Sequence, residues 1–230
     1  MKVAVFGGTG YVGSYIVEEL VNQGFTPRLL VRNGSEKKIM KPRKCEIFKG
    51  DIDNTNIVEE VISQADIVIY LIAVIREFPR KGITWEKLQF KAARSCIDIS
   101  KTHNVKKFIL MSANGVKPHG TNYQKTKFMA DEYLKNSGLN YTIFRPTSLF
   151  GDPRGNGRPE FNTQILNDML SLPIPAPLFH NGLVPLNAGE FSFSPIHVKD
   201  VASIFVKSIN NESMINKIYN LGGPDKVSWK

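Results

Sequence analysis

The chain has 230 residues, of which 42% are hydrophobic and 22% are charged, a balance that is ordinary for a soluble domain with or without a small lobe. The formal net charge is +9, but Lys and Arg are spread along the chain. The densest basic stretch, residues 36–44, has no aromatic residues between its charges. Both features argue against a nucleic-acid partner. No apolar run reaches the roughly 18 residues of a membrane-spanning helix, so we expect no integral membrane span.

Short apolar runs alternate with longer stretches of helical periodicity as far as residue 146. Strands are expected at residues 2–6, 26–32, 45–50, 66–75, 106–113 and 139–146. Helices are expected at residues 11–24, 54–64, 84–104 and 122–138. Asp53 is the expected cap of the second helix. Nearly continuous apolar strands that alternate with helices form parallel sheets covered on both faces, so the sequence predicts an α/β fold with a doubly wound parallel sheet of the Rossmann type.

The composition changes after Pro146. Residues 151–195 are rich in Gly, Pro and Asn and contain one helical stretch, residues 160–172. A later helix is expected at residues 197–210, and a late strand is expected at residues 217–223.

This change predicts two domains. The main domain would cover residues 1–150, and a smaller C-terminal lobe would cover residues 151–230, interleaved with the late elements of the main sheet. Ser228 has the side chain of a helix cap, but only two residues follow it. We therefore expect the chain to be truncated at its C-terminus.

Three glycines, Gly7, Gly10 and Gly13, lie between the first expected strand and the first expected helix. Residues without a Cβ atom let the backbone approach a pyrophosphate group, and the N-terminus of the following helix offers N–H groups and a partial positive charge. A tight turn without a ligand is the alternative. We interpret the segment as a dinucleotide-binding turn, which makes residues 1–150 an NAD(P)-binding domain. The expected cofactor contacts of the turn are Gly7, Thr9, Gly10, Tyr11, Val12 and Gly13.

The end of the second expected strand indicates which dinucleotide is bound. An Asp or Glu there would accept hydrogen bonds from the adenosine ribose and suit NAD. The chain has Arg32 in that place, with Lys37 and Lys38 close behind. A guanidinium can pair with a 2′-phosphate and stack on adenine. We therefore favour NADP, with NAD also possible, and a solvated strand end is the alternative.

Tyr123 and Lys127 are four residues apart in an expected helix, so their side chains share one face, about 5–6 Å apart at Cβ. The pKa of tyrosine is near 10, whereas proton transfer at neutral pH works best near 7, and this difference corresponds to roughly 4 kcal/mol. A nearby ammonium and a positive nicotinamide ring would both favour the phenolate. The pair is therefore a candidate for acid–base catalysis, and two polar residues on a helix surface are the alternative.

The glycine spacing, GxxGxxG, resembles that of the short-chain dehydrogenase/reductase superfamily in its extended and atypical branches, and the resemblance covers nearly the whole chain. It implies that Ser112 completes a catalytic set with Tyr123 as acid/base and Lys127 as its electrostatic partner. Ser112 would donate a hydrogen bond to the substrate. The further cofactor contacts that the resemblance implies are Asp51, Ile52, Ala73, Lys127, Pro146 and Thr147.

Three segments, "FRPTSLFG", "SPIHVKDVA" and "YNLGGP", are similar to the NDUFA9-like family of complex I accessory subunits. In the mitochondrial members of that family the nucleotide is thought to be bound structurally and not turned over. The chain also resembles sugar-nucleotide epimerases and dehydratases, although its lobe is short for a sugar nucleotide. A third resemblance is to a group of redox-sensing regulators, and Tyr123 argues against it because members of that group commonly lack the tyrosine.

These patterns predict an NADP(H)-dependent oxidoreductase that acts on a small carbonyl, alcohol or quinone-like substrate held by the C-terminal lobe. One alternative is a non-catalytic NADP(H)-binding subunit or redox sensor, and a second is a sugar-nucleotide epimerase or dehydratase. Association with a larger redox complex and formation of an oligomer both remain open.

Four further residues give weaker signals. Cys45 and Cys96 stand in unrelated contexts, so we expect neither a disulfide nor a metal site, and we expect a reducing, cytoplasmic location. His197 is expected to pack or to face solvent rather than to enter the active site. Asp200 is expected near the start of a helix.

Overall fold

Seven parallel strands form the central sheet of the computed structural model, which describes residues 1–155, 158 and 192–228. The strands are β1 (Lys2–Phe6), β2 (Thr26–Val31), β3 (Glu46–Lys49), β4 (Ile67–Tyr70), β5 (Lys107–Met111), β6 (Tyr141–Pro146) and β10 (Lys217–Leu221). Their order across the sheet is β3, β2, β1, β4, β5, β6, β10, so the direction of winding reverses between β1 and β4. In open parallel sheets, ligands bind beside such a reversal, at the carboxyl ends of the strands.

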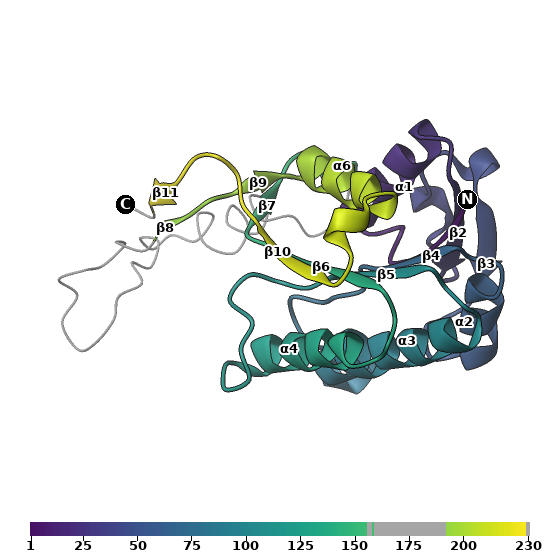
Figure 1. The fold of residues 1–230 in the computed structure, drawn as a ribbon, viewed down its shortest axis with the longest axis horizontal. Helices are drawn as coiled ribbons and strands as arrows, with labels where there is room; N and C mark the ends of the chain where they lie inside the picture. Colours follow the sequence, from purple (N-terminus) through teal and green to yellow (C-terminus); the bar gives the residue numbers. More distant parts are fainter. Residues whose placement is uncertain (156–157, 159–191, 229–230) are drawn as a thin grey trace.

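Helices cover both faces of this sheet (Figure 1). One face carries α1 (Tyr11–Asn22) and α6 (Val198–Ile209), and the other carries α2 (Thr55–Ile62), α3 (Ala92–Thr102) and α4 (Asn122–Lys135). Fully buried apolar side chains fill both layers between sheet and helices, among them Ile16 in the first layer and Ile62 in the second. The doubly wound α/β fold that the sequence predicts is therefore confirmed.

The strand expected at residues 66–75 is shorter in the structure. β4 ends at Tyr70, which pairs with Phe6, the last residue of β1. Because β1 then enters the glycine turn, residues 71–75 have no strand on that side with which to continue the pairing. They leave the sheet, and Ile75 is 60% exposed. The apolar pattern was therefore wrong for these five residues, which form a loop at the carboxyl edge.

The helix expected at residues 84–104 has two parts. A π-helix at Glu86–Lys91 leads directly into α3. Gln89 in the π-helix donates a hydrogen bond to the carbonyl oxygen of Val74 (3.1 Å) and accepts one from the hydroxyl of Thr126 in α4 (3.0 Å). Short π segments often occur at functional sites, and this one joins the loop after β4 to the helix that carries Tyr123.

The N-terminus of α2 is capped by Asn54. The prediction that Asp53 is the cap is therefore wrong by one residue. The Asn54 side chain accepts hydrogen bonds from the amides of Asn56 and Ile57. Asp53 forms an ion pair with Lys87 instead (2.5 Å). Asn and Asp are both favoured at this position, so sequence alone does not distinguish the two neighbours.

The other described elements are short. The strands β7 (Leu149–Phe150) and β9 (Ile196–His197) pair in parallel, and β8 (Ser192–Phe193) pairs with β11 (Val227–Ser228) in antiparallel fashion. Single 3-10 turns occur at Glu36–Lys38, Pro42–Lys44, Pro79–Lys81 and Glu212–Met214. Ser228, which we expected to cap a helix, therefore lies in a strand. The helix expected at residues 160–172 lies outside the described residues.

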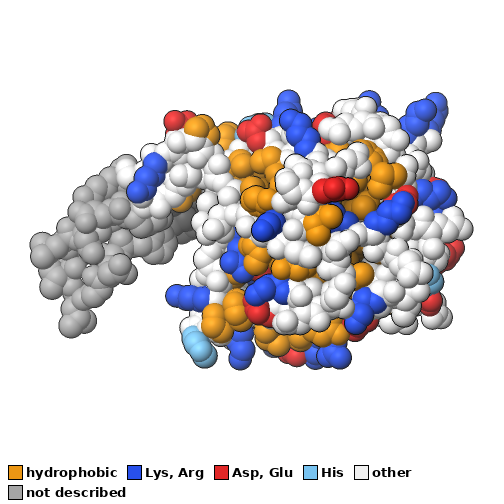
Figure 2. Space-filling view, in the orientation of Figure 1, with side chains coloured by type: hydrophobic (Ala, Val, Ile, Leu, Met, Phe, Trp, Pro, Cys, Tyr) orange, Lys and Arg blue, Asp and Glu red, His pale blue; other side chains and the backbone are white. Residues whose placement is uncertain are grey.

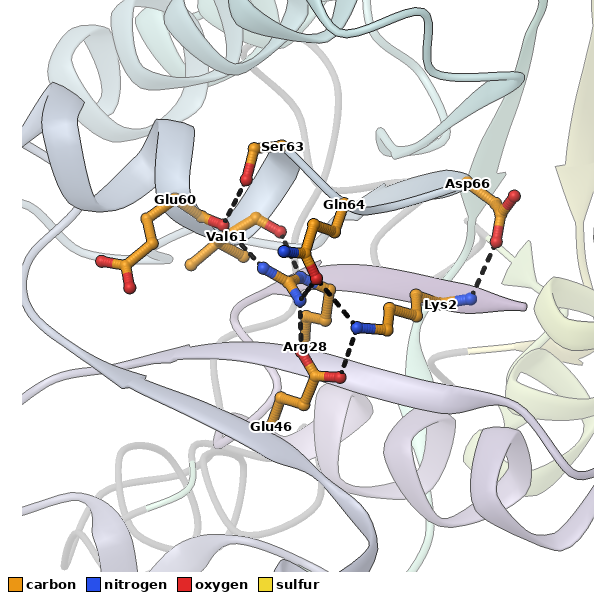
Figure 3. A network of polar contacts seen from close by, with 8 residues as sticks. All are labelled: Lys2, Arg28, Glu46, Glu60, Val61, Ser63, Gln64 and Asp66. Carbon is orange, nitrogen blue, oxygen red and sulfur yellow. Dashed lines mark hydrogen bonds and ion pairs between the residues drawn. The ribbon is translucent and has the colours of Figure 1, made fainter.

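A polar network joins α2 to the first strands near their amino ends (Figure 3). The Arg28 guanidinium is 3% exposed and donates hydrogen bonds to the carbonyl oxygens of Val61 (2.8 Å) and Glu60 (2.7 Å) in α2. It also pairs with the Glu46 carboxylate in β3, which forms a second ion pair with Lys2 in β1 (2.8 Å). Removing one partner of a buried charge is strongly destabilising. This network therefore holds the sheet together at the edge opposite the glycine turn.

One face of the molecule has a mixed surface (Figure 2). Lys and Arg side chains are scattered over the face shown in Figure 2, with apolar and uncharged groups between them. Within residues 1–155, 158 and 192–228, no helix is long and apolar enough to cross a membrane.

Candidate dinucleotide and active site

The turn between β1 and α1 depends on two of its glycines. Gly7 has a φ of +94°, a conformation that side chains disfavour, and its carbonyl oxygen accepts a hydrogen bond from the Gly10 amide (3.0 Å). A Cβ atom at Gly13 would lie 2.1 Å from the Gly7 carbonyl oxygen. Glycine at position 13 is therefore required for α1 to pack this closely on the end of β1.

Gly10 is the N-cap residue of α1, and no side chain caps that end of the helix. A Cβ atom at Gly10 would meet only the Gly7 carbonyl oxygen within 4 Å, at 3.2 Å, so the residue faces open space. No acidic side chain lies in the first turn of α1. Because a helix N-terminus carries a partial positive charge, this arrangement suits an anion. The turn therefore fits the pyrophosphate of a dinucleotide.

Three of the expected cofactor residues direct their side chains into the core. Tyr11, Val12 and Ile52 are 8%, 9% and 7% exposed and pack within the apolar clusters. They can therefore meet a ligand mainly through their backbone. Of the other expected contacts on this part of the chain, Thr9 is half-buried, whereas Asp51 and Ala73 are exposed.

Arg32 directly follows β2, the neighbour of β1 in the sheet. Its side chain is exposed, and within the described part of the chain it makes no hydrogen bond or ion pair. Lys37 is also exposed, and Lys38 is half-buried. The Arg32 guanidinium is therefore available to an anion at the strand end beside the glycine turn.

Arg158, which no sequence pattern indicated, lies between the glycine turn and the segment that follows β2. Its guanidinium donates hydrogen bonds to the carbonyl oxygens of Thr9 (3.1 Å), Lys38 (2.7 Å) and Arg154 (2.7 Å), and the side chain is 7% exposed. Thr9 and Lys38 are 149 and 120 residues away in sequence, so no local pattern could have revealed these contacts. Arg158 thereby ties the chain beyond β7 to two sides of the expected adenosine site.

Tyr123 and Lys127 share one face of α4, as their spacing predicts. The Lys127 Nζ atom lies 6.0 Å from the centre of the Tyr123 ring. It donates a hydrogen bond to the carbonyl oxygen of Met111, the last residue of β5 (3.0 Å). Lys127 is only 5% exposed, and burial lowers its pKa to about 8. A buried ammonium therefore lies beside the phenol at the carboxyl end of β5.

Burial raises the pKa of Tyr123, which is opposite to the lowered pKa that we expected from the neighbouring ammonium. The indole of Trp85 packs edge-on against the Tyr123 ring, with 6.1 Å between ring centres, and its Nε1 donates to the carbonyl oxygen of Val74 (3.0 Å). The loss of water around the phenol is the cause of this shift in pKa, and the phenol is protonated at neutral pH.

Ser112 follows β5 and is 3% exposed. Its hydroxyl donates a hydrogen bond to Asp131 Oδ2 (2.9 Å), so the proton that we expected to serve a substrate points to a buried carboxylate. Arg145 in β6 binds the same oxygen through Nε and Nη2, both at 2.9 Å. Sequence reasoning missed Asp131 and Arg145. The available signal was that Asp131 lies one turn after Lys127 on the same helix face.

The chain after β6 is fixed by contacts with the C-terminal segment. Pro146 is buried, and the Thr147 amide donates to the carbonyl oxygen of Leu221 in β10 (2.8 Å). The Thr147 hydroxyl donates to the carbonyl oxygen of Ser194. Pro146 and Thr147, both expected cofactor contacts, therefore lie at the carboxyl edge of the sheet, but the Thr147 hydroxyl proton already forms a hydrogen bond.

His197 is half-buried and packed, one of the two placements that the sequence predicts. Its Nδ1 accepts a hydrogen bond from the Lys199 amide at the start of α6 (3.2 Å), and its ring packs edge-on against Phe150, with 5.2 Å between ring centres. Asp200 lies in the first turn of α6, which confirms that prediction.

The fold brings two clusters to one edge of the sheet. The glycine turn follows β1, while Ser112 follows β5, with β4 between these two strands. Arg32 and Asp51 follow β2 and β3 on the other side of the turn. In doubly wound sheets a dinucleotide lies across this edge at the point where strand order reverses. The glycine turn, Arg32 and Ser112 therefore lie along the edge at which a dinucleotide binds in such sheets.

Comparison with known proteins agrees with this geometry. Residues 7–168 match the model of a protein family described as NAD(P)H-binding. The chain is 25% identical over 225 residues to the mitochondrial NADH-ubiquinone oxidoreductase 40 kDa subunit of Neurospora crassa, and this match covers 96% of the present chain and 55% of the subunit. It is also 25% identical over 241 residues to the chloroplastic divinyl chlorophyllide a 8-vinyl-reductase of Cucumis sativus, and this match covers 98% of the present chain and 54% of the reductase. The chain thus spans about half the length of these relatives.

Solved structures share the architecture. The UDP-glucuronic acid 4-epimerase from Bacillus cereus, in complex with NAD, superimposes with a TM-score of 0.76 at 18% identity, covering 99% of this chain and 79% of that chain. At this level of identity the similarity concerns the fold alone, and it agrees with the Rossmann-type sheet described above.

Proposed function

The chain belongs to the NAD(P)H-binding family. From this premise we propose that it is an oxidoreductase of the short-chain dehydrogenase/reductase type, which transfers hydride between NADP(H) and a small carbonyl, alcohol or quinone-like substrate. The observation that carries the proposal is the buried ammonium of Lys127 beside the Tyr123 phenol, on the sheet edge that also holds the glycine turn.

Tyr123 is the acid–base residue of this proposal. Its phenol, protonated in the resting protein, donates a proton to the carbonyl oxygen of a substrate while the carbonyl carbon receives hydride. In the reverse direction the phenolate accepts the proton of the alcohol. A bound nicotinamide cofactor supplies or accepts the hydride. Lys127 stabilises the phenolate and donates hydrogen bonds to ribose hydroxyls, since an ammonium has three donors and the Met111 carbonyl oxygen engages one of them.

The choice of NADP(H) rests on Arg32. An exposed guanidinium with no partner among the described residues stands where an acidic side chain would bind the ribose of NAD. Asp51 is near by in the fold, but it follows β3 and not β2. The 2′-phosphate of NADP would therefore gain a charge-assisted hydrogen bond at this strand end.

A non-catalytic NADP(H)-binding subunit is the second candidate. The hydrogen bond from Ser112 to Asp131 favours it, because the hydroxyl proton that would polarise a carbonyl is directed elsewhere. The Neurospora crassa relative is a subunit of NADH-ubiquinone oxidoreductase, which supports association of this chain with a larger redox complex under that reading.

Binding and turnover experiments separate the two candidates. The protein would be titrated with NADPH and NADH by fluorescence and then screened for NADPH oxidation with aldehydes, ketones and quinones, with Gly10→Val as the control for oxidation that does not depend on the cofactor site. Turnover of at least one compound by the parent, but not by Gly10→Val, supports the oxidoreductase. Tight NADPH binding without turnover across the screen favours the subunit.

A further inference from the structure

Next to the Tyr123–Lys127 pair, a buried carboxylate has contacts that the proposed reaction does not use. Asp131 is fully buried in α4. One of its oxygens, Oδ2, accepts hydrogen bonds from the Ser112 hydroxyl and from two nitrogens of Arg145, all at 2.9 Å. Three donors on one oxygen indicate an ionised carboxylate, because an ionised carboxylate is the strongest acceptor available in a protein.

The second oxygen of Asp131 has a different environment. Oδ1 is buried and has no hydrogen-bond partner among the described residues. Asp131 is one of the residues that line a small pocket, together with Ser112, Lys127 and Gln89. A buried polar atom without a partner is costly. The ion pair with Arg145 gives a structural reason for a carboxylate here, but it involves Oδ2 alone and leaves Oδ1 without a partner among the described residues.

The state of this carboxylate determines what Ser112 can offer to a ligand. A serine hydroxyl has one proton and two lone pairs. While Asp131 is ionised it can only accept, so Ser112 gives its proton to Asp131 and presents lone pairs to its other neighbours. When Asp131 is protonated, the carboxyl group can donate to Ser112, and the serine proton becomes free to point at a substrate oxygen.

We propose that Asp131 is a positioning residue whose protonation decides whether Ser112 donates a hydrogen bond to the substrate or accepts one from it. Protonated Asp131 makes Ser112 the donor that a carbonyl oxygen requires, and ionised Asp131 makes it an acceptor for a hydroxyl group. The inference deepens the proposed oxidoreductase function and rests on it.

The charged groups around Asp131 are consistent with such a change. Burial raises the pKa of this carboxyl group, while Ser112, Arg145 and Lys127 each act to lower it. Arg145 faces Asp131 from β6, Ser112 from the end of β5, and Lys127 from the preceding turn of α4. Reduction of a carbonyl should therefore be fastest below the pKa of Asp131 and should slow as pH rises through it.

The first test does not depend on turnover. The Asp131 carboxyl carbon would be followed by 13C NMR as a function of pH in the parent, in Ser112→Ala and in Thr142→Val. Thr142 is the matched control, since it too has a fully buried hydroxyl, but this hydroxyl donates to the backbone oxygen of Met214 (2.7 Å) and not to Asp131. We expect Ser112→Ala to raise the pKa of Asp131 and Thr142→Val to leave it unchanged. An unchanged Asp131 titration in Ser112→Ala would overturn the proposal.

The second test measures the reaction, with phenanthrenequinone and NADPH as the probes. Asparagine at position 131 can accept from Arg145 through its oxygen and donate to Ser112 through its nitrogen, so it imitates the protonated acid. In the parent, kcat/KM should fall at least tenfold as pH rises through the pKa of Asp131, on the acidic side of the profile. In Asp131→Asn this fall should be absent. The same acidic limb in both proteins would contradict the role of Asp131. If neither protein turns over the quinone or any other compound of the screen while the NMR result holds, the proposed function fails but the Ser112–Asp131 bond stands.

Discussion

At the scale of single residues, Lys127 has the most demanding environment in the candidate site. Its ammonium is almost fully removed from water, and its hydrogen bond to the Met111 carbonyl oxygen replaces only part of the lost hydration. The carboxylate that raises its pKa, Asp131, is already shared by Arg145 and Ser112. A buried charge with so little compensation weakens the fold, which is typical of residues retained for function.

Replacing this charge should stabilise the protein without cofactor. Burial lowers the pKa of Lys127 from 10.5 to about 8, and each pKa unit corresponds to about 1.4 kcal/mol, so the penalty is of the order of 3 kcal/mol. Below pH 8 lysine is charged in both the folded and the unfolded states, and the penalty is complete. Between pH 8 and 10.5 the unfolded state binds more protons, so the stability of the parent rises with pH. Lys127→Met should therefore be more stable than the parent at pH 7, and the difference should close by about pH 10.5.

The measurement is the free energy of unfolding in urea at several pH values. Lys125→Met, on the exposed side of the same helix, is the control and should show no comparable gain. If Lys127→Met were less stable than the parent at pH 7, the ammonium would be a net stabilising group, and our description of its environment would be wrong.

Arg32 allows a prediction about cofactor preference. Arg32→Ala removes the cation that we place beside the 2′-phosphate, and the loss of one charge-assisted hydrogen bond is about 1.5–3 kcal/mol. NADPH binding should weaken roughly 10- to 100-fold on this account, while NADH binding should hardly change. The check is a pair of calorimetric titrations, with the exposed Arg43→Ala as the control cation. An equal loss for both cofactors would remove Arg32 from the role of selecting NADP.

The sequence was informative about single residues where spacing is local. The four-residue separation of Tyr123 and Lys127 predicted their common face, because one turn of helix fixes it. The same reasoning could not find Arg145, which meets Asp131 only after the chain has passed into the next strand. Arg158 could not be predicted from local spacing either, since its partners Thr9 and Lys38 come from the first elements of the fold.

At the scale of elements, two glycines of one turn should respond differently to substitution. The backbone of Gly10 is extended, with φ −72° and ψ 178°, and its missing side chain faces open space, so Gly10→Val should fold but lose dinucleotide binding. A Cβ at Gly13 would overlap the Gly7 carbonyl oxygen, so Gly13→Ala should destabilise the protein by about 1–3 kcal/mol or more.

Thermal unfolding with and without NADPH distinguishes the two effects. Gly10→Val should keep a melting temperature near that of the parent and gain nothing from NADPH, whereas Gly13→Ala should melt lower in both conditions. A Gly10→Val protein that NADPH stabilises as well as it stabilises the parent would contradict the pyrophosphate site.

Element types were easier to predict from the sequence than element ends. The alternation of apolar strands and helices identified the sheet, because burial on both faces leaves a continuous apolar run. The end of β4 was missed because residues 71–75 keep that pattern after β1, their partner on one side, has turned away. The π-helix at Glu86–Lys91 was missed because its residues share the periodicity of the α-helix that follows.

At the scale of the whole molecule, strand order explains why distant residues act together. β4 separates β1 from β5, so the glycine turn and Ser112 lie two strands apart on one edge, although they are about a hundred residues apart in sequence. The network around Arg28 holds the opposite edge together and uses none of the candidate site residues. The fold thus separates the charges that stabilise it from those that we assign to chemistry.

The central claim is that Tyr123 transfers a proton while NADP(H) exchanges hydride with a substrate. Stopped-flow measurement of NADPH oxidation by the parent and by Tyr123→Phe, with a substrate found in the screen, tests it most directly. The substitution removes one hydroxyl group, so NADPH affinity should change less than twofold, whereas the rate of oxidation should fall roughly 100-fold or more, the usual scale of acid–base catalysis. An oxidation rate in Tyr123→Phe equal to that of the parent would show that the phenol has no part in the chemistry.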